Sequence, residues 1–268
     1  MNEGYGKPPL GVRLAILAGL LLIMIGAPTG ALMWMTAVPG HSWQGPLTAL
    51  DKDGIRLAER LRDHVQTIAS APHNVAHPQA LERSARFLEH SLYSLGYRVR
   101  RQSFPVGGTR VRNIEAVVEP ADSRAPTLVV GAHYDSYGDA LGANDNATGA
   151  AAILELARAL RPLSGRSGVR FRLVLFVNEE PPFFQTDEMG SRVYARALKA
   201  SGEQVLGMIS LETMGYYDDA DGSQHYPAPI GAFYPTAGNF VAFVASPLSA
   251  ATNGAALRVD GGVLKGAY

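Results

Sequence analysis

Two apolar segments of this chain each end in side chains that can bind a metal ion. The first follows Thr127, contains the run LVV, and leads into His133 and Asp135. The second, RLVLFVNEE, ends with Glu179 and Glu180. Short apolar runs bounded by polar residues are typical of strands buried inside a sheet. Two such strands predict that the chain gathers His, Asp and Glu side chains at one edge of a sheet.

Strands and helices alternate around these segments. Apolar residues that recur every three or four positions predict amphipathic helices, and alternating or continuous apolar runs predict strands. The predicted helices cover residues 53–68, 79–95 and 189–200, together with an Ala- and Leu-rich segment that ends at Leu160. The predicted strands lie within residues 97–104, 111–120, 128–130, 169–177 and 205–217. This order predicts an α/β layer fold with a mostly parallel central sheet.

In a parallel sheet, ligands bind beyond the carboxyl ends of the strands. A third predicted strand, GMISL, ends just before Glu212, so a further acid is expected at the same edge. Asp145 lies in the Gly-rich sequence GANDNATG, where Asp and Asn are favoured as caps of a following helix. If Asn146 or Thr148 caps that helix, Asp145 is free to point at the site. The convergence of these strand ends is more informative than any one motif.

Each of these residues also has an ordinary interpretation. A lone His is more often a surface or satisfied core residue than a ligand, but a carboxylate near a ligand His can fix its ring, as Asp135 would do for His133. Adjacent acids usually form a solvated turn, since neighbouring side chains of a strand face opposite ways. A turn at the strand end would let Glu179 and Glu180 reach one cleft. One would bind metal, and the other would move a proton from metal-bound water to a leaving amine.

Composition narrows the chemistry. The chain has 24 Lys and Arg, 24 Asp and Glu, and no Cys. Without Cys there are no disulfides, thiolate metal sites or Cys nucleophile. A metal must therefore be held by His, Asp and Glu, which suits zinc or a harder divalent ion. Because the positive and negative charges balance, the chain has no excess of Lys and Arg that would favour binding to nucleic acid, and nucleic acid is not an expected partner.

The N-terminus carries an uncharged segment over residues 14–38, preceded by Lys7 and Arg13. Its length suffices to span a bilayer, and preceding positive charges favour a cytoplasmic N-terminus. We expect residues 1–13 to form a cytoplasmic tail, 14–38 a transmembrane helix or signal anchor, 39–53 a linker, and 54–268 an extracytoplasmic domain. A cleaved signal peptide is the alternative.

The motifs HYDS, GANDNATGAAAILELAR, FVNEE, EMGSRVYA and MISLETMGYY occur in this order over about residues 64–246. Together they resemble the M28 family of zinc aminopeptidases. The resemblance implies a three-layer α/β sandwich of the zinc-exopeptidase type, which holds two zinc ions and removes N-terminal residues from peptides. It further implies a cis peptide bond after Asp145.

The resemblance also implies a role for each candidate. His133 and Glu212 would bind one zinc, Glu180 the other, and Asp145 would bridge both. Glu179 would be the general base, and Asp135 would orient His133.

Two departures from the family pattern affect the expected activity. The family more often has Asp where this chain has Glu212, and its last zinc ligand is a His late in the domain. The one His after His133 is His225, which comes too early. From the resemblance we expect a C-terminally incomplete domain that binds two zinc ions or one. The expected function is a membrane-anchored aminopeptidase that hydrolyses peptides with metal-activated water. The alternatives are a truncated or degenerate non-catalytic module and a single-zinc enzyme similar to glutaminyl cyclases.

Overall fold

The structure is a computed structural model that describes residues 9–36 and 49–215 of the chain. It divides into two units, Met1–His41 and Ser42–Tyr268. Three features discussed above lie outside the described residues: His225, the C-terminal part of the domain after residue 215, and most of the linker at residues 39–53.

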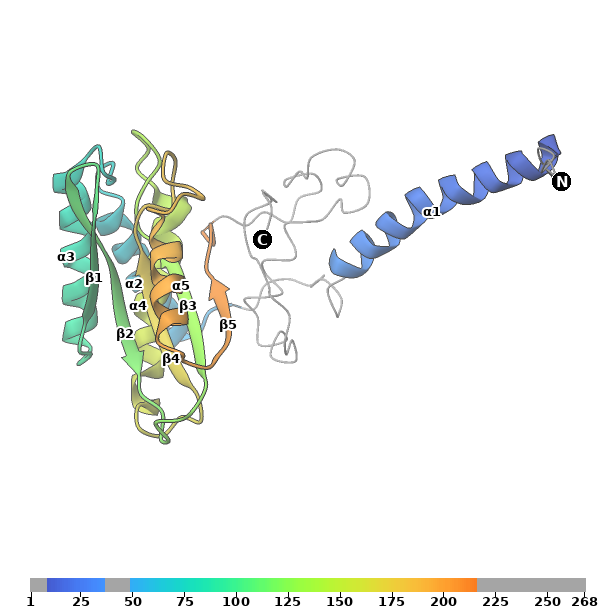
Figure 1. Cartoon of the computed structure of the whole chain (residues 1–268). Helices are drawn as coiled ribbons and strands as arrows, with labels where there is room; N and C mark the ends of the chain where they lie inside the picture. Colours follow the sequence, from blue (N-terminus) through green and yellow to red (C-terminus); the bar gives the residue numbers. More distant parts are fainter. Residues whose placement is uncertain (1–8, 37–48, 216–268) are drawn as a thin grey trace. The chain divides into compact units, whose positions relative to one another are not determined.

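A five-stranded sheet forms the centre of the second unit, with the strand order β1-β2-β4-β3-β5 (Figure 1). Its strands are β1 (Arg100–Val106), β2 (Thr109–Val118), β3 (Thr127–His133), β4 (Arg170–Phe176) and β5 (Val205–Ser210). Strands β4, β3 and β5 are parallel neighbours. Their carboxyl ends therefore meet at the same edge of the sheet.

The sheet is mixed because β1 and β2 run antiparallel to their neighbours. Two residues with positive φ, Gly107 and Gly108, join β1 to β2. A two-residue hairpin connects antiparallel strands only, whereas parallel strands need a long crossover. The expected parallel pairing thus holds for the three strands that end in candidate ligands. Of the other two strands, β2 runs in the opposite direction and β1 runs in the same direction as β4.

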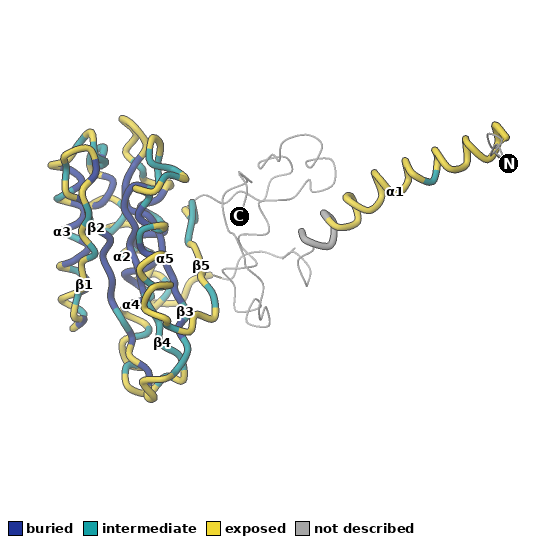
Figure 2. Tube along the Cα trace, viewed as in Figure 1, coloured by how far each residue is buried: buried dark blue, intermediate teal, exposed yellow. Residues whose placement is uncertain are grey.

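Helices cover both faces of the sheet and produce three layers. The helices α2 (Lys52–Ile68), α3 (Pro78–Ser94) and α4 (Thr148–Leu160) share one buried cluster with alternate sheet residues such as Val130 and Leu175. On the other face, Val129 and Val174 pack with Tyr194 of α5 (Gly190–Ala200). Figure 2 shows the buried stretches of the sheet between these layers. The α/β layer fold predicted from the sequence is confirmed.

The packing of the Phe176 side chain over β3 requires a glycine at position 131. A side chain at Gly131 of β3 would lie 2.3 Å from the Phe176 ring of β4. The missing Cβ lets this ring lie across β3, and His133 then pairs with Phe176 at the end of both strands. His133 therefore leaves β3 directly beside the end of β4, which leads to Glu179 and Glu180.

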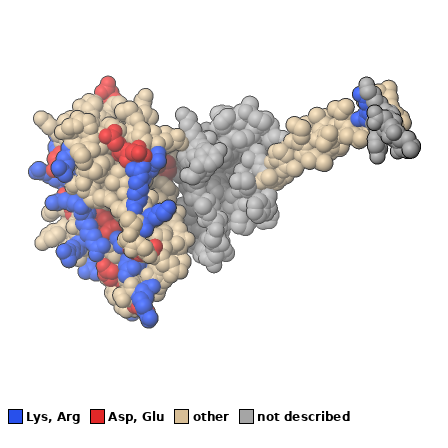
Figure 3. Space-filling model, viewed as in Figure 1, with Lys and Arg blue, Asp and Glu red and all other residues tan. Residues whose placement is uncertain are grey.

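The first unit contains a single described helix, α1 (Leu10–Thr36). Its stretch Leu10–Ala31 is long and apolar enough to cross a membrane, by length and composition. At 1.5 Å per residue, 22 helical residues extend about 33 Å, which matches a hydrocarbon core of about 30 Å. In Figure 3 the described surface of α1 is uncharged except for basic atoms near its N-terminal end. The segment predicted at residues 14–38 is helical as far as Thr36.

An ion-pair network fastens β5 to the rest of the sheet. Glu203, two residues before β5, accepts hydrogen bonds from Arg172 of β4 at 2.5 Å and 3.0 Å, and another from the Thr127 hydroxyl. Arg172 also pairs with Glu115 of β2 at 2.9 Å. The hydrogen bonds from Arg172 lower the pKa of Glu203 to about 2, although burial opposes the shift.

We expect Glu203→Gln to lower the free energy of unfolding at pH 7 by about 1–3 kcal/mol, because a depressed native pKa stabilises the ionised folded state. This stabilisation is complete above the unfolded carboxyl pKa of about 4.3 and is lost as pH falls towards 2. The difference between variant and wild type, measured by urea unfolding, should therefore narrow from pH 5 to pH 2.5.

Glu119→Gln is the matched control. Glu119 also pairs with Arg170, at 3.6 Å, but its side chain is 53% exposed. An exposed pair is worth about 0–1 kcal/mol, so this variant should remain close to wild type. A Glu203→Gln difference that stays constant across this pH range would contradict the assigned pKa.

Candidate metal centre

His133 lies at the end of β3 with its side chain 2% exposed. Its Nδ1 atom donates a hydrogen bond to the backbone carbonyl of Asp135 at 3.1 Å. This bond fixes the ring, so that Nε2 faces a group of carboxylates. Nε2 lies 3.1 Å from Asp145 Oδ1 and 3.3 Å from Glu212 Oε1. Residues from three separate parts of the chain thus meet at one nitrogen atom.

Asp135 joins the ends of β3 and β4. Its carboxylate accepts hydrogen bonds from the backbone N–H groups of Glu179, at 3.1 Å, and Glu180, at 3.2 Å. One carboxylate oxygen also lies 3.5 Å from His133 Nδ1. The sequence predicted Asp135 as a partner of the His133 ring. In the structure, the Asp135 carbonyl holds the ring and its carboxylate holds the backbone that carries the two glutamates.

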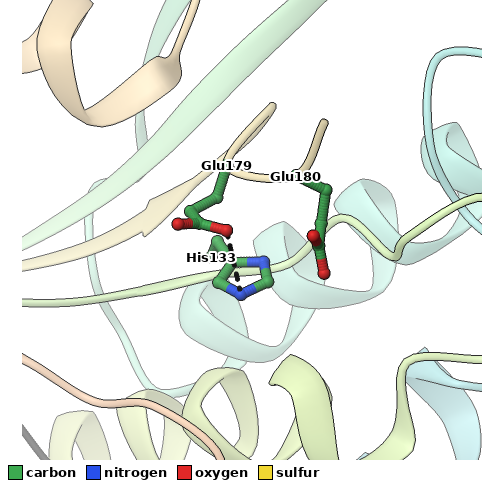
Figure 4. A group of neighbouring side chains, drawn as sticks. All are labelled: His133, Glu179 and Glu180. Atoms are coloured by element: carbon green, nitrogen blue, oxygen red, sulfur yellow. Dashed lines mark ion pairs between the residues drawn. The ribbon is translucent and has the colours of Figure 1, made fainter. Parts of the chain in front are cut away.

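Both glutamates after β4 reach the same site (Figure 4). Glu179 Oε2 lies 3.8 Å from His133 Nε2, and the ligand atoms of His133, Glu179 and Glu180 all lie within 4.8 Å of one another. Burial, with help from neighbouring carboxylates, raises the pKa of Glu179 to about 7. Burial and the nearby Asp145 raise the pKa of Glu180 to about 7 as well. The turn after β4 therefore brings both side chains into one cluster, as the sequence analysis anticipated.

Asp145 belongs to the short irregular turn η1 (Ala143–Ala147) that precedes α4. The peptide bond between Asp145 and Asn146 is cis, as the family resemblance implied. Asn146 accepts a hydrogen bond from the Gly149 N–H in the first turn of α4, and it donates one to the Leu211 carbonyl at 2.8 Å. Asn146 thus bonds to the first turn of α4 and also holds the residue before Glu212. Asp145 keeps its carboxylate free for His133.

Charge is strongly unbalanced in this cluster. Although burial lowers the pKa of His133, its bonds with Asp135, Asp145 and Glu212 raise that pKa well above the ordinary value. The bond with His133 lowers the pKa of Asp145, whereas burial raises that of Glu212. Several acids facing one imidazole make a site in which a bound cation would relieve repulsion between carboxylates.

The donor set fits a zinc ion. Zinc binds imidazole nitrogen and carboxylate oxygen at about 2.0–2.2 Å in a tetrahedral arrangement, so its ligand atoms lie about 3.3–3.6 Å apart. The distances from His133 Nε2 to Asp145 and Glu212 are close to this spacing. Among the described residues, His133 is shared by both groups with metal-ligand geometry, one with Asp145 and Glu212 and the other with Glu179 and Glu180. Neither group contains both Asp145 and Glu180, and the bridging role of Asp145 stays a prediction.

One loop near the site was not predicted to have a role. The sequence APHNVAHP, between α2 and α3, contacts the loop that follows β3 through His73 and Asn74. Its only sequence signal was a polar stretch with Pro at both ends, which is typical of any surface turn. Contacts across 62 residues cannot be inferred from such a pattern.

The chain is similar in sequence to a peptidase family and to several known proteins. A sequence profile of peptidase family M28 matches residues 113–249. The YfbL protein of Escherichia coli K12 is 40% identical over 220 residues, which cover 79% of this chain and 63% of YfbL. The aminopeptidase YwaD of Bacillus subtilis is 33% identical over 91 residues, covering 34% of this chain and 20% of YwaD. This chain therefore spans less than two thirds of the length of these relatives.

A solved structure is similar over a comparable part of the chain. The glutaminyl cyclase of Fimbriiglobus ruber is 25% identical with a TM-score of 0.50, over 71% of this chain and 68% of the cyclase. The named relatives of this chain thus include both an aminopeptidase and a glutaminyl cyclase. The side chains at the site, rather than the fold, must decide between these reactions.

Proposed function

This chain belongs to peptidase family M28, and from that premise we propose that it is a zinc-dependent aminopeptidase that hydrolyses N-terminal residues from peptides. The observation that carries the proposal is the meeting of His133 with Asp145 and Glu212 at distances of 3.1 Å and 3.3 Å, beside Glu179 at 3.8 Å. Ligands and a candidate base then share one small site. The proposed ligands are His133, Asp145, Glu180 and Glu212.

Zinc bound at such a site supplies a Lewis acid and lowers the pKa of bound water to about 7. Side chains of the protein would have to transfer protons between the attacking water and the leaving amine. Glu179 is the proposed general base because its carboxylate is half-buried beside His133 and its pKa, near 7, suits proton exchange at neutral pH. It would take a proton from the attacking water and deliver it to the departing amine. Asp135 would hold Glu179 through its backbone N–H.

Glutaminyl cyclisation is the second candidate, and the similarity to the Fimbriiglobus ruber enzyme favours it. In that reaction the N-terminal amine of a Gln peptide attacks its own side-chain amide, and ammonia leaves. Glu179 would also serve as the base in this reaction, since a proton moves from the attacking N-terminal amine to the departing ammonia. We favour hydrolysis because the aminopeptidase YwaD is 33% identical over its aligned segment.

Product analysis separates the candidates. The full chain in detergent, supplied with zinc, would be incubated with a peptide that begins with Gln and with a panel of other peptides. We expect release of free N-terminal amino acids, loss of activity with a chelator, and recovery when zinc is restored. Ammonia release from the Gln peptide without any free amino acid would replace the aminopeptidase proposal with cyclisation. Absence of both products would support a non-catalytic module.

We further propose that α1 anchors the protein in a membrane with the peptidase domain outside the cytoplasm. Under this proposal residues 1–13 are the cytoplasmic tail, 14–38 the anchor, 39–53 the linker and 54–268 the catalytic domain. The support is the length and composition of α1 together with the preceding basic residues. Retention of the chain in membranes after alkaline extraction is expected. Release of a shorter soluble form would indicate a cleaved signal peptide.

A further inference from the structure

The loop between α2 and α3 lies against the candidate metal centre although it is outside the region matched by the family profile, which begins at residue 113. Its central residue, Asn74, is half-buried. The Asn74 amide nitrogen donates to the carbonyl of Ser136 at 2.8 Å and to the carbonyl of Gly138 at 2.7 Å. One side chain therefore satisfies two carbonyls of the loop that follows β3.

A second pair of hydrogen bonds, between His73 and Ser136, lies beside the Asn74 side chain. The His73 N–H donates to the Ser136 hydroxyl at 2.9 Å, and the Ser136 N–H donates to the His73 carbonyl at 3.0 Å. Both His73 and Ser136 are 1% exposed. Four hydrogen bonds thus join residues 73–74 to residues 136–138 across more than 60 positions of sequence, and the two between His73 and Ser136 join buried residues.

The same loop has its own internal support. The Asn74 side-chain oxygen accepts from the Ala76 N–H at 3.0 Å and lies 3.2 Å from His77 Nδ1. His77 begins α3 as its N-cap residue. The oxygen of Asn74 therefore holds its own turn, while the nitrogen holds the neighbouring loop. This division allows the two functions of the side chain to be tested separately.

The contacted loop leads directly to the proposed ligands. Ser136 follows Asp135, whose carboxylate holds Glu179 and Glu180. A Cβ added at Gly142 would lie 2.8 Å from Ser136 Cβ and 2.9 Å from the Asp145 carbonyl oxygen. Ser136 is therefore packed tightly between Asp135 and the turn that carries Asp145. A shift of Ser136 would reach Asp135 through the chain and the turn of Asp145 through Gly142.

We propose that Asn74 is a positioning residue, which fixes the 136–138 loop and thereby holds Asp135 and Asp145 in the arrangement that binds the metal. Its significance for catalysis rests on the proposed zinc-dependent function. The four hydrogen bonds between residues 73–74 and 136–138, which we call the clamp, do not depend on that function. Residues that hold metal ligands typically contribute about 10–100-fold to metal affinity.

Asn74→Asp tests the clamp most directly. The substitution keeps the shape and the oxygen that accepts from Ala76, and it removes both N–H groups that reach Ser136 and Gly138. Asn74→Ala is the second variant, in case a carboxylate against two carbonyls prevents folding. Ser84→Ala is the matched control, since Ser84 also donates one buried hydrogen bond, to the Ile68 carbonyl at 3.2 Å, and this bond joins α3 to α2 rather than to the 136–138 loop.

Two measurements on the full chain are needed: zinc affinity by chelator competition, and hydrogen–deuterium exchange of residues 134–142 in the metal-free protein. For the Asn74 variants we expect about 10–100-fold weaker zinc binding and faster exchange in this segment, with both values unchanged in Ser84→Ala. Wild-type affinity and wild-type exchange in both Asn74 variants would overturn the proposal. If the wild type binds no zinc, the proposed function fails, and the exchange rates still decide the clamp: faster exchange supports it and unchanged exchange rejects it.

Discussion

Replacing Glu179 by glutamine is expected to lower the turnover number by about 10²–10⁴-fold, the usual contribution of general acid–base catalysis, while metal content stays close to wild type. Gln has the same shape but cannot accept a proton from the attacking water. In the structure Glu179 is held by its backbone rather than by its carboxylate, through the bond from its N–H to Asp135. The substitution should therefore leave the turn intact.

The measurement combines steady-state kinetics on a peptide substrate with metal analysis of the same sample. Glu188→Gln is the matched control, because Glu188 is an exposed acid nine residues further along the same connection. That variant should retain wild-type turnover. Equal turnover in Glu179→Gln and wild type would remove Glu179 from the mechanism. A parallel loss of metal would instead assign Glu179 to the ligands.

Replacing His133 by alanine is expected to weaken zinc binding by more than about 100-fold, beyond the loss typical of a supporting residue. Both groups with metal-ligand geometry among the described residues contain His133. Its removal therefore takes a ligand from either arrangement. It also leaves the carboxylates of Asp145 and Glu212 without their shared partner, His133 Nε2.

Because His133 is buried, its alanine variant must be shown to fold, by circular dichroism and a melting curve. Asp145→Ala provides a safer second variant, since the Asp145 side chain is 55% exposed and its removal leaves no buried cavity. His90→Ala, at an exposed position of α3, is the control for loss of a histidine. Zinc affinity that remains at the wild-type value in both site variants would refute the assigned ligand set.

Local patterns in the sequence were sufficient to predict the helices and strands of the fold. The predicted helices at 53–68 and 79–95 correspond to Lys52–Ile68 and Pro78–Ser94. These helices were predictable because their apolar residues follow a 3.6-residue period, which is a property of the segment itself. The antiparallel pairing of β2 with β4 was not predicted. Pairing joins residues far apart in sequence, and the apolar pattern of a buried strand is the same in either direction.

The candidate site was predictable for a related reason. His133, Glu179 and Glu212 each follow an apolar run, and parallel strands place their carboxyl ends at one edge. The sequence alone therefore indicated which side chains gather at this edge of the sheet. The bond from Asn146 to Leu211 and the clamp at Asn74 had no such signal. Asn residues in polar loops look alike in sequence, whether they face solvent or hold another segment.

The sequence by itself determined which residues form strands and helices, that α1 is apolar enough to span a membrane, and that a histidine and several acids lie at strand ends. Only the tertiary structure decided how these side chains are oriented. The Phe176 ring packs over Gly131 between β3 and β4, and Asp135 bonds to the turn that carries Glu179 and Glu180. The distances between the candidate ligand atoms depend on packing between distant segments, and this packing has no local pattern in the chain.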